Sequence, residues 1–124
     1  MAMEASTLDA VRLSMGLQQM RAELASSNIA RAGTPGLRAH TLDFSQLEGL
    51  LTAYGEGRAT AADLQQGLAA LRALSPREGS TEASTLGLDA QVAEMAAASM
   101  NYQTLGDALS RQFSLMRLAV TGRS

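Results

Sequence analysis

The last third of the chain carries an uninterrupted heptad stripe, and this stripe constrains the fold more than any other feature. Its members recur in alternating steps of four and three: Leu88, Val92, Met95, Ser99, Tyr102, Gly106, Leu109, Phe113, Met116 and Val120. The first quarter repeats the pattern at Leu8, Val11, Met15, Gln18, Ala22, Ala25, Ile29 and Ala32. Such spacing keeps one face of a helix against a partner helix. The sequence therefore predicts two long helices, one in each terminal region, in a protein built for pairing.

Helix-end signals give the limits of these two helices. A Ser-x-x-acid box at Ser6 predicts that the first helix begins there, and it should run to about Ala32. The next four residues, 33–36, read Gly-Thr-Pro-Gly, which favours a type II turn with Pro35 at its second and Gly36 at its third position. The last helix should run from about Asp89 to Thr121, with Gly122 as its C-terminal cap.

The middle of the chain predicts shorter elements. Two further capping boxes, at Ser45 and Thr60, should each open a short helix with its leucines on one face. Residues 75–87 are mostly Ser, Thr, Glu and Gly without an apolar period, which indicates a flexible linker. The chain then divides into an N-terminal helix and turn (1–36), a short-helix and linker region (37–87) and a C-terminal helix (88–124).

Each long helix also carries a second apolar stripe. The first helix has Leu13, Leu17, Met20 and Leu24 roughly opposite its main stripe, and the last helix has Ala98, Leu105, Ala108, Leu115 and Ala119. A helix with two apolar faces needs more than one neighbour. Either the middle helices cover the extra faces in a small bundle, or the terminal helices are buried between subunits. We favour the second interpretation, and it predicts that the isolated subunit is partly unfolded at both ends.

Composition supports an interaction role and excludes several others. Hydrophobic residues make up 46% of the 124 residues but aromatic residues only 3%, so the apolar content suits helix seams. Ten basic and twelve acidic residues give a net charge of −2, without the basic stripe that nucleic acid requires. No apolar run approaches the ~18 residues of a spanning helix, and the N-terminus lacks the pattern of a secretory signal peptide. We expect no nucleic-acid binding and no direct lipid insertion.

Motifs at both ends resemble the bacterial flagellar rod and hook proteins. Residues 25–36, ASSNIARAGTPG, are similar to the family's signature A-S-N-I-A-N-A-x-T-P-G-Y. Residues 37–44, LRAHTLDF, are similar to the continuation K-A-R-D-I-D-F of the proximal rod protein. In the last helix, SMNYQTL at 99–105 resembles S-L-R-Y-Q-A-L, and FSLMRLAV at 113–120 resembles K-F-x-x-L-R-x-A-I without its lysine. The resemblance covers roughly the first 50 and last 40 residues.

The resemblance implies an all-α axial protein whose terminal helices pair as an antiparallel coiled coil. It implies a structural subunit of the flagellar basal-body rod, located in the periplasm and exported through the flagellar type III gate without a cleaved signal peptide. The implied partners are other copies and other rod subunits, the adaptor between export gate and rod, and the gate itself. The interface residues are then Leu17, Met20, Leu24, Asn28, Ile29, Thr34, Pro35, Gly36, Phe44, Tyr102, Leu105, Leu109, Phe113 and Met116.

The sequence contains no catalytic or cofactor-binding constellation. His40 is the single histidine and cysteine is absent, so zinc and Cys–His chemistry lack ligands, and no cofactor or metal is expected. Asn28 is either an ordinary polar residue near the end of its helix or a buried amide that fixes helix register. An enzyme is therefore not expected. A cytoplasmic helical chaperone or adaptor for flagellar export is the alternative function, and a chaperone should be a stable, folded dimer by itself.

Overall fold

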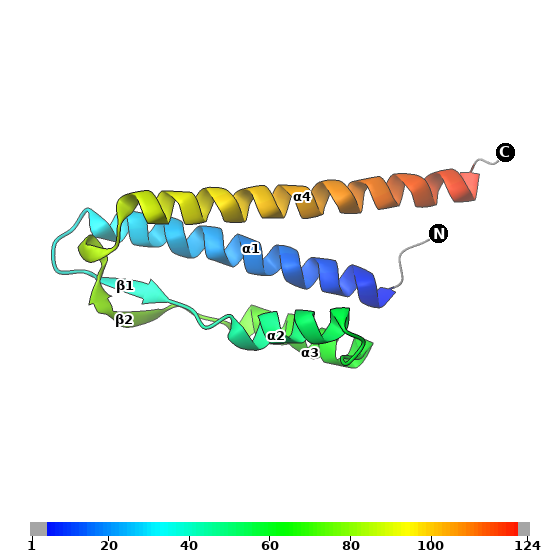
Figure 1. Ribbon diagram of the computed structural model, residues 1–124, viewed down its shortest axis with the longest axis horizontal. Helices are drawn as coiled ribbons and strands as arrows, with labels where there is room; N and C mark the ends of the chain where they lie inside the picture. The colour runs from blue at the N-terminus through cyan, green and yellow to red at the C-terminus, as the bar shows by residue number, and fades with distance from the viewer. Residues whose placement is uncertain (1–4, 122–124) are drawn as a thin grey trace.

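The computed structural model describes residues 5–121, which are mostly helical. The two long helices lie side by side and run in opposite directions, and the smaller elements lie on the side of α1 that faces away from α4 (Figure 1). Both long helices are thus confirmed, and the cap predicted at Gly122 lies outside the described residues. The elements, in chain order, are α1 (Ala5–Ala32), β1 (Arg38–Thr41), α2 (Ser45–Gly55), α3 (Ala61–Ala73), β2 (Arg77–Glu82), the 3-10 turn η1 (Ala83–Thr85) and α4 (Leu88–Thr121).

The main stripe of α1 faces α4. A Cβ on Gly106 of α4 would lie 3.7 Å from the Cε of Met15, and Asn101 Nδ2 donates to Gln18 Oε1 at 3.4 Å. Later positions on α1 therefore meet earlier positions on α4, as an antiparallel pair requires. The heptad spacing correctly predicted that the two helices pack against each other.

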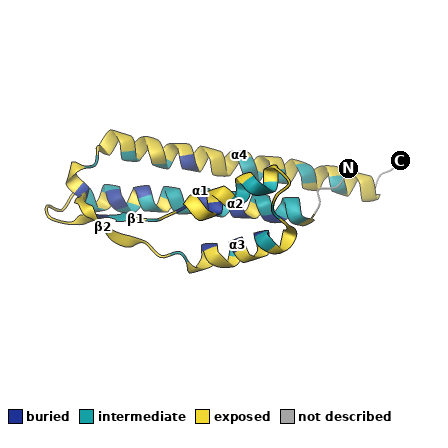
Figure 2. Ribbon diagram, turned by 60° about the horizontal axis from the view of Figure 1, so that its bottom comes forward, coloured by how far each residue is buried: buried dark blue, intermediate teal, exposed yellow. Residues whose placement is uncertain are grey.

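The second stripe of α1 is covered within the same chain. Leu13 and Leu17 contact α2 and α3, and both Leu13 and Leu64 are fully buried. Figure 2 shows the buried residues concentrated on α1 and on the faces of the short helices turned toward it. The expectation that α1 needs another subunit to cover this face is wrong, because the bundle alternative holds for α1. The core cluster consists of Leu13, Leu17, Phe44, Leu47, Leu64 and Leu71.

Two glycines allow α3 to approach α1 and α2 closely. A Cβ on Gly16 would overlap Leu71 Cδ2, and a Cβ on Gly67 would overlap Leu50 Cδ2. Because these positions lack side chains, leucines of the facing helices fill the space directly above the backbone. The covered face of α1 is therefore a tightly packed core and not a loosely shielded surface.

Polar contacts fix α2 and α3 at the N-terminal end of α1. The hydroxyl of Tyr54 lies 2.8 Å from Ser6 Oγ, and Gln65 Nε2 donates to the buried Asp9 at 3.0 Å. The prediction that Ser6 caps α1 is wrong, since the described helix already includes Ala5 and the Ser6 side chain serves the contact with α2.

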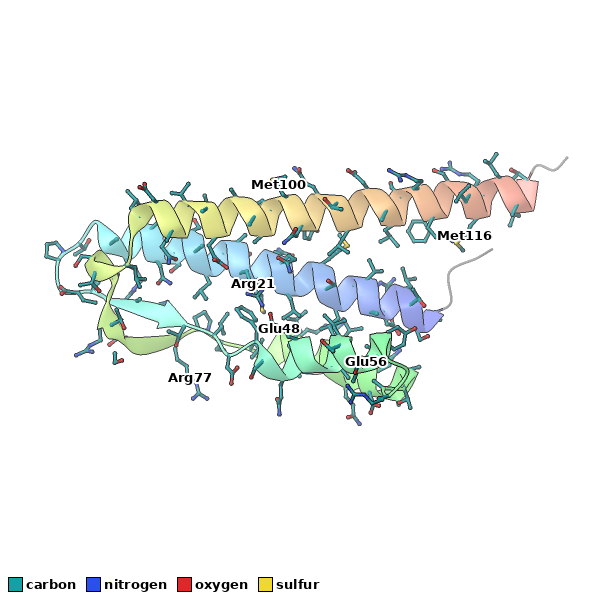
Figure 3. The ribbon with its side chains drawn as sticks, in the orientation of Figure 1. Arg21, Glu48, Glu56, Arg77, Met100 and Met116 are labelled. Carbon is teal, nitrogen blue, oxygen red and sulfur yellow. The ribbon has the colours of Figure 1, made fainter. Side chains whose placement is uncertain are left out.

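The two capping boxes of the middle region behave differently. Thr60 and Asp63 form the predicted box: each backbone N–H donates to the other's side chain, which lowers the pKa of the Asp63 carboxyl. The box predicted at Ser45 does not form, because Phe44 occupies the N-cap position of α2. Glu48 instead pairs with Arg21 of α1, and the two side chains lie between these helices (Figure 3). Glu48 therefore links α1 to α2 and does not cap the N-terminus of α2.

Residues 77–82, predicted as part of a flexible linker, form strand β2. This strand pairs antiparallel with β1, with Arg38 opposite Glu82 and Thr41 opposite Arg77, and a bulge interrupts the register. The backbone pairing continues where Ala83 N–H donates to Leu37 O at 2.8 Å. The expectations of an all-α fold and of a linker at 75–87 are therefore wrong here, because backbone hydrogen bonds order a segment that has no apolar pattern.

The type II turn predicted at Pro35 and Gly36 is confirmed, and its four residues are 34–37. Gly36 has φ of +86°, and Leu37 N–H donates across the turn to Thr34 O at 3.4 Å. Proline at the second position and a residue with positive φ at the third are the requirements of this turn. Glu82 Oε1 also accepts from Gly36 N–H at 2.7 Å, so the turn is tied to the end of β2.

We expect Gly36→Val to destabilise the subunit by about 1–3 kcal/mol, because a β-branched residue resists positive φ. Nothing lies within 4 Å of the added Cβ, so the penalty is conformational rather than steric. Gly49→Val is the matched control: it lies within α2, has no positive φ, and also has open space around its Cβ. Urea unfolding of both variants measures the difference. Equal free energies of unfolding would contradict the role assigned to Gly36.

Candidate assembly interface

Helix α4 is rich in exposed apolar side chains. Only Ala98 is buried among the described residues of this 34-residue helix. Figure 2 shows α4 exposed along most of its length. Many exposed apolar side chains along one helix are typical of an interaction surface. The exposed large hydrophobic side chains of α4 are Leu88, Val92, Met100, Tyr102, Phe113, Leu115, Leu118 and Val120.

The face of α4 that meets α1 differs from the predicted stripe. Met95, Leu109 and Met116 of the stripe are partly covered, whereas Val92 is 45% exposed and Phe113 is 46% exposed. Part of the predicted seam is therefore free for other partners. The less exposed positions of α4 are Gln91, Met95, Ala98, Leu105, Gly106, Leu109, Gln112 and Met116.

The C-terminal end of α4 extends past the start of α1. Helix α4 has 34 residues and α1 has 28, and the end of α4 projects beyond the described part of α1 (Figure 1). On this projecting end Leu118 is 65% exposed and Val120 is 85% exposed. No described element of the same chain covers these side chains, so they are available to another molecule.

The predicted motif at the end of α1 organises β1. Asn28 is 5% exposed; its Nδ2 donates to His40 O at 3.0 Å and its Oδ1 accepts from His40 N–H at 2.8 Å. One turn later Arg31 Nε donates to Arg38 O at 2.7 Å. Both side chains bond the edge of β1 that β2 leaves open. Asn28 is thus the buried amide that we proposed as one alternative, but it fixes strand β1 on α1 rather than one helix against another.

Replacing Asn28 with leucine should lower the free energy of unfolding by about 2 kcal/mol or more. The change leaves the N–H and C=O of His40 without their partner, and an unsatisfied buried group costs about 1–3 kcal/mol. Chemical denaturation measures the loss of unfolding free energy. Faster amide hydrogen exchange at His40 would show that the loss arises at the contact with Asn28. Ser26→Leu, at an exposed position two residues earlier, provides the comparison. An unchanged exchange rate at His40 would exclude the proposed clamp.

Besides Asn28, the residues predicted for the interface fall into four groups. Leu17 and Phe44 belong to the subunit's own core, with Met20 and Leu24 partly buried against it. Thr34, Pro35 and Gly36 form the exposed turn. Ile29, Leu105, Leu109 and Met116 are half-buried, and Figure 3 shows Met116 directed toward the α1 side of α4. The predicted residues that remain exposed on α4 are Tyr102 and Phe113.

Sequence analysis missed Met100 and Leu118 as surface residues. Both are about two-thirds exposed, and Figure 3 shows Met100 on the side of α4 remote from α1. Neither fits the two apolar stripes, so a search for heptads passes over them. The signal that could have found them is the scarcity of charge on every side of this helix.

Within residues 5–121, no cluster of three or more His, Cys, Asp or Glu side chains is placed to hold a metal ion. The backbone of His40 is engaged by Asn28. Hydrogen bonds from Ser45 lower the pKa of Asp43, as Thr60 does for Asp63, and both effects belong to helix N-termini. No described helix is long and apolar enough to cross a membrane. Among the described residues, the arrangement offers apolar surfaces for binding.

Comparison with known proteins gives no match: no family model, no curated protein and no solved structure is significantly similar to this chain. The surfaces described above and the short motifs at the two ends are therefore the features that point to a function.

Proposed function

We propose that this protein is a structural subunit of the bacterial flagellar basal-body rod, most like its proximal member. The observation that carries the proposal is the apolar surface of α4, which α1 covers only in part. A second support is where the rod-like motifs fall: residues 25–36 include the end of α1 and the type II turn, and 37–44 include β1. The motif residues thus build one continuous feature, from Asn28 through Gly36 to His40.

In this proposal α1 and α4 form an antiparallel coiled coil that stacks with the same helices of neighbouring subunits. Contacts between unlike surfaces that do not close produce a helical assembly. The resulting tube would span the periplasm, transmit torque and surround the export channel. The exposed turn at 33–36 and the exposed side chains of Tyr102 and Phe113 are the contact sites that we assign to neighbours.

The proposal also names the route and the partners. The subunit would leave the cytoplasm through the flagellar type III export gate, contact the adaptor between gate and rod, and then join other rod subunits and copies of itself. It acts without a cofactor, as a structural protein and not as an enzyme.

Deletion and localisation in the source bacterium test the proposal. Deletion should abolish swimming, and isolated basal bodies should contain the protein as density in the rod by cryo-electron microscopy. Expression of the intact sequence should restore swimming, which serves as the control. Normal swimming of the deletion strain, or basal bodies without the protein, would contradict the proposal.

An export chaperone remains the second candidate, and the closed core is the observation that favours it. With Leu13 and Leu64 fully buried, α1, α2 and α3 have the packing of a stably folded protein, as a chaperone requires. Amide exchange alone would not separate the two candidates, because both then predict a protected α1. Cellular location does: a chaperone stays in the cytoplasm bound to an export substrate, whereas a rod subunit is recovered with the basal body.

A further inference from the structure

An apolar groove lies on the side of α1 that faces away from α4. It is formed where the chain enters and leaves the α2–α3 hairpin, and its volume is about 370 Å³. That is far more than the ~30 Å³ share of one water molecule, so it has room for side chains. The groove is lined by Met20, Glu23, Leu24, Ser27, Leu42, Leu74 and Pro76.

The wall of this groove is mostly aliphatic, and the acidic side chain of Glu23 is also part of its lining. Leu24, Leu42 and Leu74 are only half-buried although they pack against the core. Glu23 is exposed, and its carboxylate forms no ion pair with any residue in the described range 5–121. The groove therefore suits an apolar segment that carries a positive charge.

The outer face of α4 has these properties. Arg111, Leu115 and Leu118 follow one another at intervals of four and three, so they share one side of the helix. All three are exposed, and Arg111 forms no ion pair with the residues that the structure describes. Leu118 belongs to the end of α4 that extends past α1 (Figure 1).

We propose that this groove receives Leu115 and Leu118 of a second copy of the chain, with Arg111 of that copy placed near Glu23. The inference rests on the proposed function, since it names where the apolar surface of α4 binds. The α4 of the same molecule cannot fill the groove, because it lies across α1 and none of its residues lines it. Donor and acceptor are different surfaces, so each added copy leaves a new groove and a new helix end, and the contact repeats without closing.

Cysteine cross-linking tests the contact directly, because the protein has no cysteine of its own. One preparation carries Ser27→Cys, in the groove, and the other carries Leu118→Cys, on the helix end. Mixed under mild oxidation, they should give at least fivefold more disulfide-linked heterodimer than the mixture of Ser26→Cys with Leu118→Cys. Ser26 is the matched control, since it is adjacent but does not line the groove. Equal yields from the two mixtures would overturn the proposal.

Charge reversal tests the pairing of Glu23 with Arg111. Each of Glu23→Arg and Arg111→Glu should weaken self-association about fivefold in sedimentation equilibrium, and the double variant should recover to within twofold of the original protein. Arg117→Glu is the control, because Arg117 lies on α4 but off the face shared by Arg111 and Leu118. Failure of the double variant to recover, or an equal effect of Arg117→Glu, would contradict the assignment.

These outcomes separate the inference from the proposed function. Specific cross-linking by a protein that is absent from basal bodies would support the groove contact and reject the rod assignment. A protein present in the rod but without the specific cross-link would support the rod assignment and reject the groove. A symmetric dimer linked through Ser27→Cys alone would also reject it, because the contact would then join two grooves.

Discussion

Replacing Leu64 with alanine should destabilise the subunit by about 2–5 kcal/mol, the usual cost of removing a leucine from a core that cannot collapse around the cavity. Leu64 has no exposed surface and belongs to the cluster that joins α3 to α1. Natural domains are stable by only about 5–15 kcal/mol, so this change should remove a large part of the total. Guanidinium unfolding followed by circular dichroism gives the value.

Leu118→Ala is the matched control for Leu64→Ala. It removes the same atoms from a side chain that is 65% exposed, and we expect a change of less than about 0.5 kcal/mol. Similar losses of unfolding free energy in both variants would mean that α2 and α3 do not cover α1 in solution. That result would support the expectation of a partly unfolded subunit.

Phe113→Asp should abolish assembly while leaving the isolated subunit folded. The ring is 46% exposed on α4, so aspartate is hydrated in the free subunit, but a charge without a partner in a dry helix interface costs several kcal/mol. In the source bacterium, swimming should be lost although the protein is still made. Circular dichroism and a motility assay on the same variant measure the two properties.

Two further variants complete the comparison with Phe113→Asp. Leu109→Asp should destabilise the subunit itself, because Leu109 is half-buried on the part of α4 that faces α1. Ser114→Asp, at an exposed neighbouring position, should affect neither folding nor swimming. Normal swimming of the strain with Phe113→Asp would contradict the assignment of Phe113 to the interface.

The sequence by itself determined the helices and the turn. Heptad spacing, the box at Thr60 and the Pro35–Gly36 pair act over a few residues, so they specify local backbone geometry before any tertiary contact forms. For this reason α1, α3 and α4 and the positive φ of Gly36 could be predicted.

Tertiary structure decided what covers each face. The predicted main stripe of α4 and the positions that are covered share Met95, Leu109 and Met116, and only packing against α1 decides which of the other positions are covered. Strand β2 carries no apolar pattern, and its order depends on backbone bonds to β1, a segment about 40 residues away in the chain. Asn28 likewise gains its role from His40, whose N–H and C=O are the open edge of β1. Contacts between distant segments leave no periodic trace in the sequence, so the groove beside Leu24 and the outward surface of α4 became visible only in the folded chain.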